Sequence, residues 1–206
     1  AALGVGAGGW GGALRLRKEF VEVFDGAIFN NDTRNTIISE GRPIDITDIA
    51  DRDQGYILEK YSNATSTGEF GSDQTFVDTD FPLFRLADVY LMYVEAHLRG
   101  GTGANPTDAA NYINSLRARA NNPQNNLSIS DIDLDFILDE RARELHWEAH
   151  RRQDLIRYGR FTGGSYNWTW KGNGSNGISL PAFRSLYPIP AASLASNPNL
   201  VQNPGY

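Results

Sequence analysis

Two helical patterns joined by a very short connection occupy the middle of the chain. The first covers residues 81–99, with Thr79 or Asp80 as its expected N-cap and Gly100-Gly101 as its stop signal. The second covers residues 107–121, where apolar residues recur at three- and four-residue spacing: Ala109, Ala110, Ile113, Leu116 and Ala120. A connection of about five residues favours antiparallel packing of the helices that it joins. The sequence therefore predicts a helical hairpin, the unit of helical-repeat folds.

A third helical pattern begins near Ser130 and extends to residue 159, with a break near Asp133 as an alternative. Its apolar residues share one face, and oppositely charged residues follow one another at three- or four-residue spacing elsewhere. Exposed pairs of this kind contribute roughly 0.3–0.5 kcal/mol each to helix stability. The expected pairs are Asp139 with Arg143, Glu148 with Arg152, and Asp154 with Arg157.

The remaining segments show few regular patterns. Residues 14–24 have helical spacing, and residues 56–61 are typical of a strand, with 75–77 as its expected partner. Glycines and prolines recur after Gly163, which predicts an extended loop-rich tail. The predicted fold class is therefore mainly α, with an irregular region over residues 1–80 and few short strands.

Composition excludes several classes of function. The chain has 25 acidic and 19 basic residues, a formal charge of -6, which argues against a phosphate-neutralising surface for nucleic acid. It contains no cysteine, so disulfides, cysteine nucleophiles and thiolate metal sites are excluded. Its most apolar stretch is interrupted by four ionisable residues, Arg85, Asp88, Glu95 and His97, and does not read as a membrane span.

Two local motifs match known ligand loops only in part. Residues 4–9 have the glycine spacing of a dinucleotide-binding loop but lack the preceding strand that such a loop needs, which favours a flexible loop. An acidic group resembles a calcium loop, but its glycine falls one position early and Glu59 is misplaced for the closing ligand. We expect a solvated acidic loop, no metal and no cofactor, with calcium as the alternative for Asp45, Asp48, Asp51 and Asp53.

A dense group of charged residues lies on the third helical pattern. Glutamates four residues apart on one helix face could supply the acid and base of a glycoside hydrolase, with Glu140 or Glu144 acting together with Asp154. Neighbouring arginines lower carboxylate pKa values, which is the wrong direction for a general acid. The sequence therefore favours a structural ion-pair network formed by Glu140, Arg141, Glu144, Glu148, Arg151 and Asp154.

An aromatic loop stands out in the last part of the chain. Residues 161–206 contain seven aromatic residues and no carboxylate, a composition suited to neutral ligands. Trp168 and Trp170 alternate, so an extended backbone would direct both rings to one side. Such rings either anchor the loop in a core, which is the favoured reading, or form a platform for a sugar. The candidate ligand-binding residues, chosen by chemistry alone, are Tyr166, Asn167, Trp168, Trp170 and Trp10.

Several segments also carry distinctive patterns in a fixed order. They are Phe81 to Ala96 (FPLFRLADVYLMYVEA), Ile113 to Ala120 (INSLRARA), Ile137 to Arg157 (ILDERARELHWEAHRRQDLIR), Leu186 to Pro190 (LYPIP) and Asn197 to Tyr206 (NPNLVQNPGY). Together they resemble the C-terminal region of the SusD/RagB family over residues 81–206. The resemblance implies tetratricopeptide-like helix pairs beside an irregular region, with residues 1–80 as the middle part of that fold.

The resemblance also implies a function. Members of this family are surface-exposed outer-membrane lipoproteins of Bacteroidetes-type bacteria that serve nutrient uptake and polysaccharide utilization. They bind oligosaccharides or other nutrients without catalysis and deliver them to a SusC-type TonB-dependent transporter. Full members are more than twice as long, so we expect this chain to be a C-terminal portion, with its lipid anchor upstream. The alternatives are a glycoside hydrolase and a helical-repeat scaffold without a small ligand.

Overall fold

The computed structural model describes residues 14–73, 76–122 and 126–206. The chain divides into two compact units, one ending at Arg151 and the other running from Arg152 to Tyr206. The boundary between these units falls inside the third helical pattern. The irregular residues of the first unit stay with its helices because Arg34 pairs with Glu140 on the third helix and Lys60 pairs with Glu148 just after that helix.

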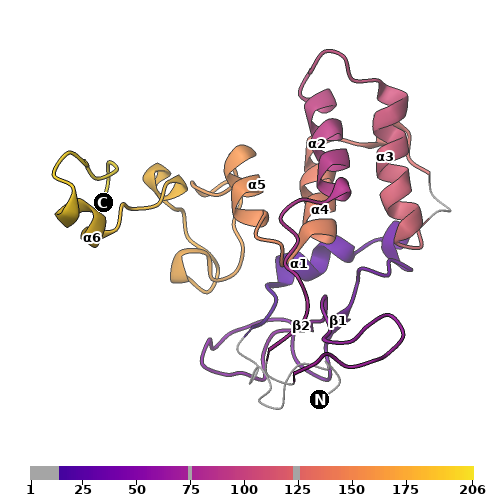
Figure 1. Cartoon of the computed structure of the whole chain (residues 1–206), viewed down its shortest axis with the longest axis horizontal. Coiled ribbons are helices and arrows are strands. Elements are labelled where there is room, and N and C mark those ends of the chain that lie inside the picture. The colour runs from indigo at the N-terminus through magenta and orange to yellow at the C-terminus, as the bar shows by residue number, and fades with distance from the viewer. Residues whose placement is uncertain (1–13, 74–75, 123–125) are drawn as a thin grey trace. The chain divides into compact units, whose positions relative to one another are not determined.

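The predicted helical hairpin is present. Helix α2 spans Leu86–Leu98 and helix α3 spans Pro106–Arg119, and the two lie side by side in Figure 1. Asn105 caps α3 by accepting a hydrogen bond from the backbone N–H of Thr107 at 2.8 Å. Gly100, in the left-handed region with φ of 84°, ends α2 as expected.

The expected start of α2 was wrong. The N-cap position belongs to Arg85, and Thr79 and Asp80 lie outside the helix. Arg85 makes no side-chain cap, because a guanidinium has no acceptor for the free N–H groups at a helix start; it donates to Glu144 and Glu148 of the first unit. A tertiary ion pair therefore sets where the side chain at the helix start points.

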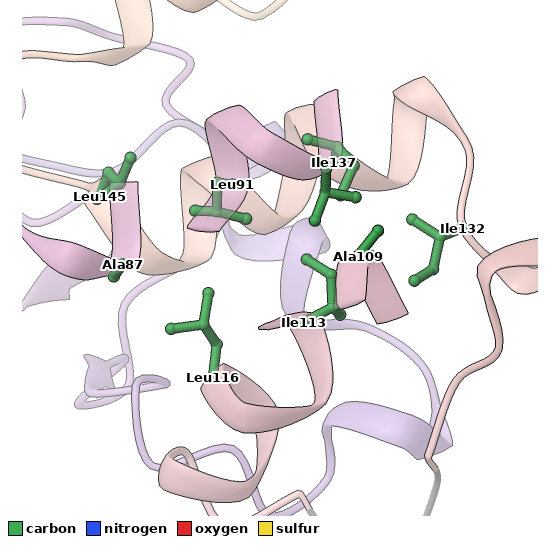
Figure 2. Packing of buried hydrophobic residues seen from close by; sticks show 9 residues of the cluster. Ala87, Leu91, Ala109, Ile113, Leu116, Ile132, Ile137 and Leu145 are labelled. Atoms are coloured by element: carbon green, nitrogen blue, oxygen red, sulfur yellow. The ribbon is translucent and has the colours of Figure 1, made fainter. Parts of the chain in front are cut away.

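A third helix, α4, completes the core of the first unit. It spans Leu134–Leu145, follows the short 3-10 helix η3 (Ile129–Asp131) and packs against α2. Asp133 caps α4 by accepting a hydrogen bond from the backbone N–H of Phe136 at 2.7 Å. Figure 2 shows the apolar side chains that meet between the three helices, among them Leu91, Ile113 and Ile137, all fully buried. Of the predicted stripe on α3, Ala109, Ile113, Leu116 and Ala120 are buried and Ala110 is half-buried.

The third helical pattern does not form one helix to residue 159. Helix α4 ends at Leu145, and α5 begins separately at Arg151 and ends at Arg157. Between them, Trp147 and Ala149 have φ values of 61° and 63°, which no right-handed helix allows. Lys60 donates to the backbone carbonyls of Glu144, in the last turn of α4, and of His146, its C-cap, at 3.0 and 2.7 Å, so neither carbonyl needs a further helical turn.

The rest of the first unit is irregular, as predicted. The expected helix within 14–24 is one turn of α-helix, α1 (Lys18–Val21), followed by the 3-10 helix η1 (Glu22–Phe24); a second, η2, covers Ala27–Phe29. Strand β2 (Ile57–Leu58) lies within the predicted 56–61 segment, but its antiparallel partner is β1 (Ile37–Ile38). Residues 76 and 77 are not a strand, and residue 75 lies outside the described residues.

The second unit consists of short elements tied together by side chains. After α5 come the 3-10 helices η4 (Lys171–Asn173) and η5 (Ala182–Ser185) and helix α6 (Ala191–Ser196). The Gln202 amide bonds both backbone groups of Ile189, at 2.8 and 2.9 Å, in place of a strand partner. The Tyr206 hydroxyl donates to the carbonyl of Leu186 at 2.8 Å. Side-chain hydrogen bonds thus replace a β-ladder in the loop-rich tail.

The mainly helical fold class is confirmed: the described residues contain six α-helices and two strands of two residues each. None of these helices combines the length and the apolar character that crossing a membrane requires.

The packing of the three helices can be tested by a matched pair of truncations on α2. Leu91→Ala should lower the free energy of unfolding by about 2–5 kcal/mol, because Leu91 is fully buried among α3 and α4 residues. Met92→Ala, one residue along on the exposed side, should cost less than about 1 kcal/mol. Urea denaturation measures both. Equal losses would contradict the assigned core.

Candidate functional site

The residues singled out from the sequence lie in both units. The glutamates of α4 belong to the first unit, and the aromatic loop belongs to the second. Trp10 and residues 4–9 lie outside the described residues.

Glu140 lies at the centre of a buried ion-pair network in the first unit. It is fully buried and bonds Arg34 at 2.8 Å and Arg143 at 2.7 Å, while Arg34 also bonds Asp32 at 2.6 Å. Burial alone would raise the pKa of Glu140, but the positive charges of Arg34 and Arg143 outweigh it and lower the pKa to about 2. Glu140 is thus an anion throughout the physiological pH range.

The next two glutamates of this face extend the network. Glu144 contacts three arginines, Arg34 and Arg85 at 3.0 Å each and Arg119 at 2.5 Å. Glu148 contacts Arg85 at 2.7 Å and also Lys60. Burial raises the pKa of Glu148, but hydrogen bonds from Arg85 and Lys60 lower it further than burial raises it. Neither carboxylate is left with a free face for acid or base chemistry.

The predicted network is only partly assembled. Glu140, Glu144 and Glu148 share it, but Arg141 turns to the other side of α4 and pairs with the buried Asp88 of α2 at 2.8 Å. Arg151 donates to the carbonyl of Leu138 at 2.8 Å. Asp154 lies in the second unit and pairs with Arg157 at 2.8 Å, as the helical spacing predicted.

The other two expected helix pairs are wrong. Arg143 bonds Glu140 and the carbonyl of Val23 rather than Asp139, because its guanidinium is buried beneath the ring of Phe29. Arg152 donates to the carbonyl of Arg184 at 2.9 Å instead of pairing with Glu148, since the helix break separates these residues. The cations that do hold the glutamates, Arg34, Lys60 and Arg85, lie at least 59 residues from them in the sequence, so no helical spacing indicates these pairs.

A cavity of about 290 Å³ adjoins this network. Its basic lining residues are all engaged in ion pairs with the acidic residues named above: Arg34, Lys60, Arg85, Arg119 and Arg143. His146, also in its wall, has a pKa lowered to about 4 by burial and by the charge of Lys60, so it is neutral at pH 7. Among the described residues, the cavity therefore offers an anion no unpaired basic side chain.

The aromatic loop of the second unit does not have the expected extended form. Thr169 and Trp170 lie in a turn, and Trp170 has a left-handed backbone with φ of 64°. The backbone here is therefore not the extended one that would direct both tryptophan rings to one side. Trp168 forms a cluster with Phe161 and Tyr166, at ring-centroid distances of 6.1 and 6.2 Å. Asn167, between them, is exposed.

A buried lysine supports this cluster. The Lys171 ammonium donates to the carbonyls of Gly163 and Tyr166 at 2.9 and 2.6 Å and lies 4.7 Å from the Trp168 ring centre. Burial lowers the pKa of Lys171. The lysine therefore fixes the backbone on both sides of the exposed Gly164 and Ser165, which places Tyr166 next to Trp168.

The aromatic cluster continues through an arginine. The Arg152 guanidinium lies 4.2 Å from the ring centres of both Phe161 and Tyr187, and the Tyr187 side chain is 69% exposed. Sequence reasoning missed Phe161, Tyr187 and Lys171. Only their shared position in the carboxylate-free tail could have indicated them.

The acidic loop is organised by an arginine. Arg15 donates to the backbone carbonyls of Ile49, Asp51 and Gln54, the kind of oxygen atoms that a calcium ion would require. The carboxylates of Asp48 and Asp51 accept hydrogen bonds from nearby backbone N–H groups. Within the described ranges, no group of three or more acidic or histidine side chains is placed to hold a metal ion.

Known proteins resemble this chain over most of its length. The starch-binding protein SusD of Bacteroides thetaiotaomicron is 42% identical over 152 residues, which is 74% of this chain and 26% of that protein. The SusD-like protein P25 of Formosa agariphila is 36% identical over 127 residues, 59% of this chain and 23% of that protein. The chain thus spans about a quarter of the length of the curated relatives that it matches.

Solved structures agree with this relationship. A putative sugar binding protein from Bacteroides vulgatus has a TM-score of 0.51 and 32% identity, over 67% of this chain and 31% of that chain. A SusD superfamily protein from Parabacteroides distasonis has a TM-score of 0.58 over 92% of this chain and 41% of that chain, and at 23% identity it shows the fold alone. Residues 23–206 match the SusD family model, and the chain therefore belongs to the SusD family.

Proposed function

We propose that this protein binds oligosaccharide without catalysis at the bacterial outer-membrane surface and delivers it to a SusC-type TonB-dependent transporter. The observation that carries the proposal is the family membership together with 42% identity to a starch-binding relative. Delivery, the transporter partner and the surface location are supported by the family membership alone.

The aromatic cluster of the second unit is the proposed sugar contact. Trp168 and Tyr166 are partly exposed, Trp170 and the exposed Asn167 are their neighbours, and no carboxylate occurs from residue 161 to the end. Aromatic faces cover the apolar C–H side of a pyranose, and amides bond its hydroxyls. A neutral glucan suits this chemistry better than an ionic ligand.

The same chain offers poor chemistry for a glycoside hydrolase. A hydrolase needs one protonated carboxyl group as general acid near neutral pH. Glu140 is buried, anionic and held by two arginines, and Glu148 has a lowered pKa. Asp154 is committed to Arg157. We therefore propose that these carboxylates are structural.

The sugar contact can be tested by calorimetry with a malto-oligosaccharide. Trp168→Ala should weaken binding about tenfold, since one lost ring contact is worth roughly 1.4 kcal/mol. Phe70→Ala, which removes a ring that is 80% exposed in the other unit, is the matched control and should leave affinity unchanged. Unchanged affinity in Trp168→Ala with a lower melting temperature would show that the ring only anchors the loop.

The role of Glu144 can be tested by an isosteric change. Glu144→Gln should lower the free energy of unfolding by about 3–5 kcal/mol, because three arginines lose their shared anion. Asp139→Asn on the same helix, whose carboxylate lies 4.0 Å from Arg151, should cost less than about 1 kcal/mol. A stable Glu144→Gln variant that loses turnover of a glycan would instead establish the hydrolase.

The network also predicts a pH dependence. The pKa of Glu140 is about 2 in the folded chain, below its ordinary value of 4.5, so its contribution to stability is complete above about pH 4.5. That contribution should decline as the pH falls toward 2. The free energy of unfolding, measured by urea denaturation at several pH values between 2 and 6, should change less steeply with pH in Glu140→Gln than in the unmodified chain. Identical slopes would mean that Glu140 is not held as an anion.

A further inference from the structure

A second pocket, of about 200 Å³, lies in the first unit where the segment around α1 meets the end of α4. Four arginines, the rings of Phe20 and Trp147 and the imidazole of His146 contribute to its wall, and none of its lining residues is acidic. It differs in this respect from the cavity beside Glu144, in which every basic residue has an acidic partner. The six lining residues that matter here are Arg15, Arg17, Arg141, Arg151, Phe20 and Trp147.

The charges of two of these arginines are not balanced by ion pairs. Arg141 is paired with Asp88, and Arg151 lies 4.0 Å from Asp139. Arg15 gives its N–H groups to backbone carbonyls, which are neutral, and no described carboxylate forms an ion pair with it. Arg17 forms neither a hydrogen bond through its side chain nor an ion pair with any described residue.

The surroundings of Arg17 add to its unbalanced charge. Burial lowers the pKa of Arg17, the neighbouring charge of Arg15 lowers it further, and Glu19 offsets part of that effect. A bound anion would relieve this repulsion. Partly buried guanidinium groups close to each other are the usual protein partner for a carboxylate, which they bind through charge-assisted hydrogen bonds.

The aromatic side chains of the pocket indicate what the anion is attached to. Trp147 is 43% exposed and has φ of 61°, a conformation that costs on the order of 1–3 kcal/mol for a bulky residue. Phe20, on the opposite segment, packs edge-on against His146 at 5.3 Å. An indole and a phenyl ring beside two arginines fit a ring with an apolar face and one carboxylate.

We propose that this pocket binds a single carboxylate-bearing sugar unit, a hexuronate, with its carboxylate at Arg17 and Arg15 and its ring beside Trp147 and Phe20. The volume, below the roughly 300–1,000 Å³ of sites for larger ligands, holds one ring rather than a chain. This site lies in a different unit from the proposed contact for neutral sugars and has the opposite ligand preference.

Calorimetry of the whole chain with glucuronate and with glucose tests the proposal, because the two differ only in the carboxylate. Glucuronate should bind, and glucose should bind at least about tenfold more weakly. Arg17→Gln should weaken glucuronate binding about tenfold, and Arg17→Lys should restore part of it. Lys18→Gln removes the same charge from the adjacent residue, which pairs with Asp45 outside the pocket, and should leave binding unchanged.

Other results would overturn the proposal. Equal binding of glucose and glucuronate would show that the carboxylate has no role. Equal losses of glucuronate affinity in Arg17→Gln and Lys18→Gln would show that only the overall positive charge matters. Acetate that competes as well as glucuronate would remove the role of the rings. Trp168→Ala should not affect glucuronate binding, so this site and the proposed contact for neutral sugars can fail independently.

Discussion

The buried contact between Arg34 and Glu140 holds together two parts of the first unit that share no regular structure. Arg34 lies in the irregular segment, 106 residues before its partner on α4. The guanidinium of Arg34 forms ion pairs with Asp32, Glu140 and Glu144. The position of the loop against α4 and the neutralisation of these three carboxylates therefore depend on this one side chain. Replacing only one member of such a group leaves buried charge without compensation, which makes the arrangement cooperative.

Local signals in the sequence account for the hairpin and for the core. The spacing of Ala109, Ile113 and Leu116 and the glycines after α2 depend on neighbouring residues, and the structure confirms them. Contacts across the chain account for the errors. Arg85, at the start of α2, pairs with Glu148, which is 63 residues away. Lys60 donates to the carbonyl of His146, just after the end of α4 and 86 residues away.

The candidate sites show the same limit. Composition indicated an aromatic, carboxylate-free tail, and Trp168 does lie in a ring cluster there. The left-handed turn at Trp170 and the lysine that supports the cluster arise from backbone geometry, which a residue pattern does not encode. The arginine pocket beside Trp147 was not predicted at all, because Arg17 and Trp147 are 130 positions apart and neither lies in a recognisable motif.

The carboxylate-free composition of the tail also decides where acid acts on this molecule. The second unit contains five basic residues and one acidic residue, Asp154, so almost all groups that gain a proton between neutral pH and pH 2 belong to the first unit. Acid therefore removes ion pairs from one unit while the other keeps nearly the same charge. Protonation thus distinguishes the two units of a chain whose helices and loops otherwise share one family fold.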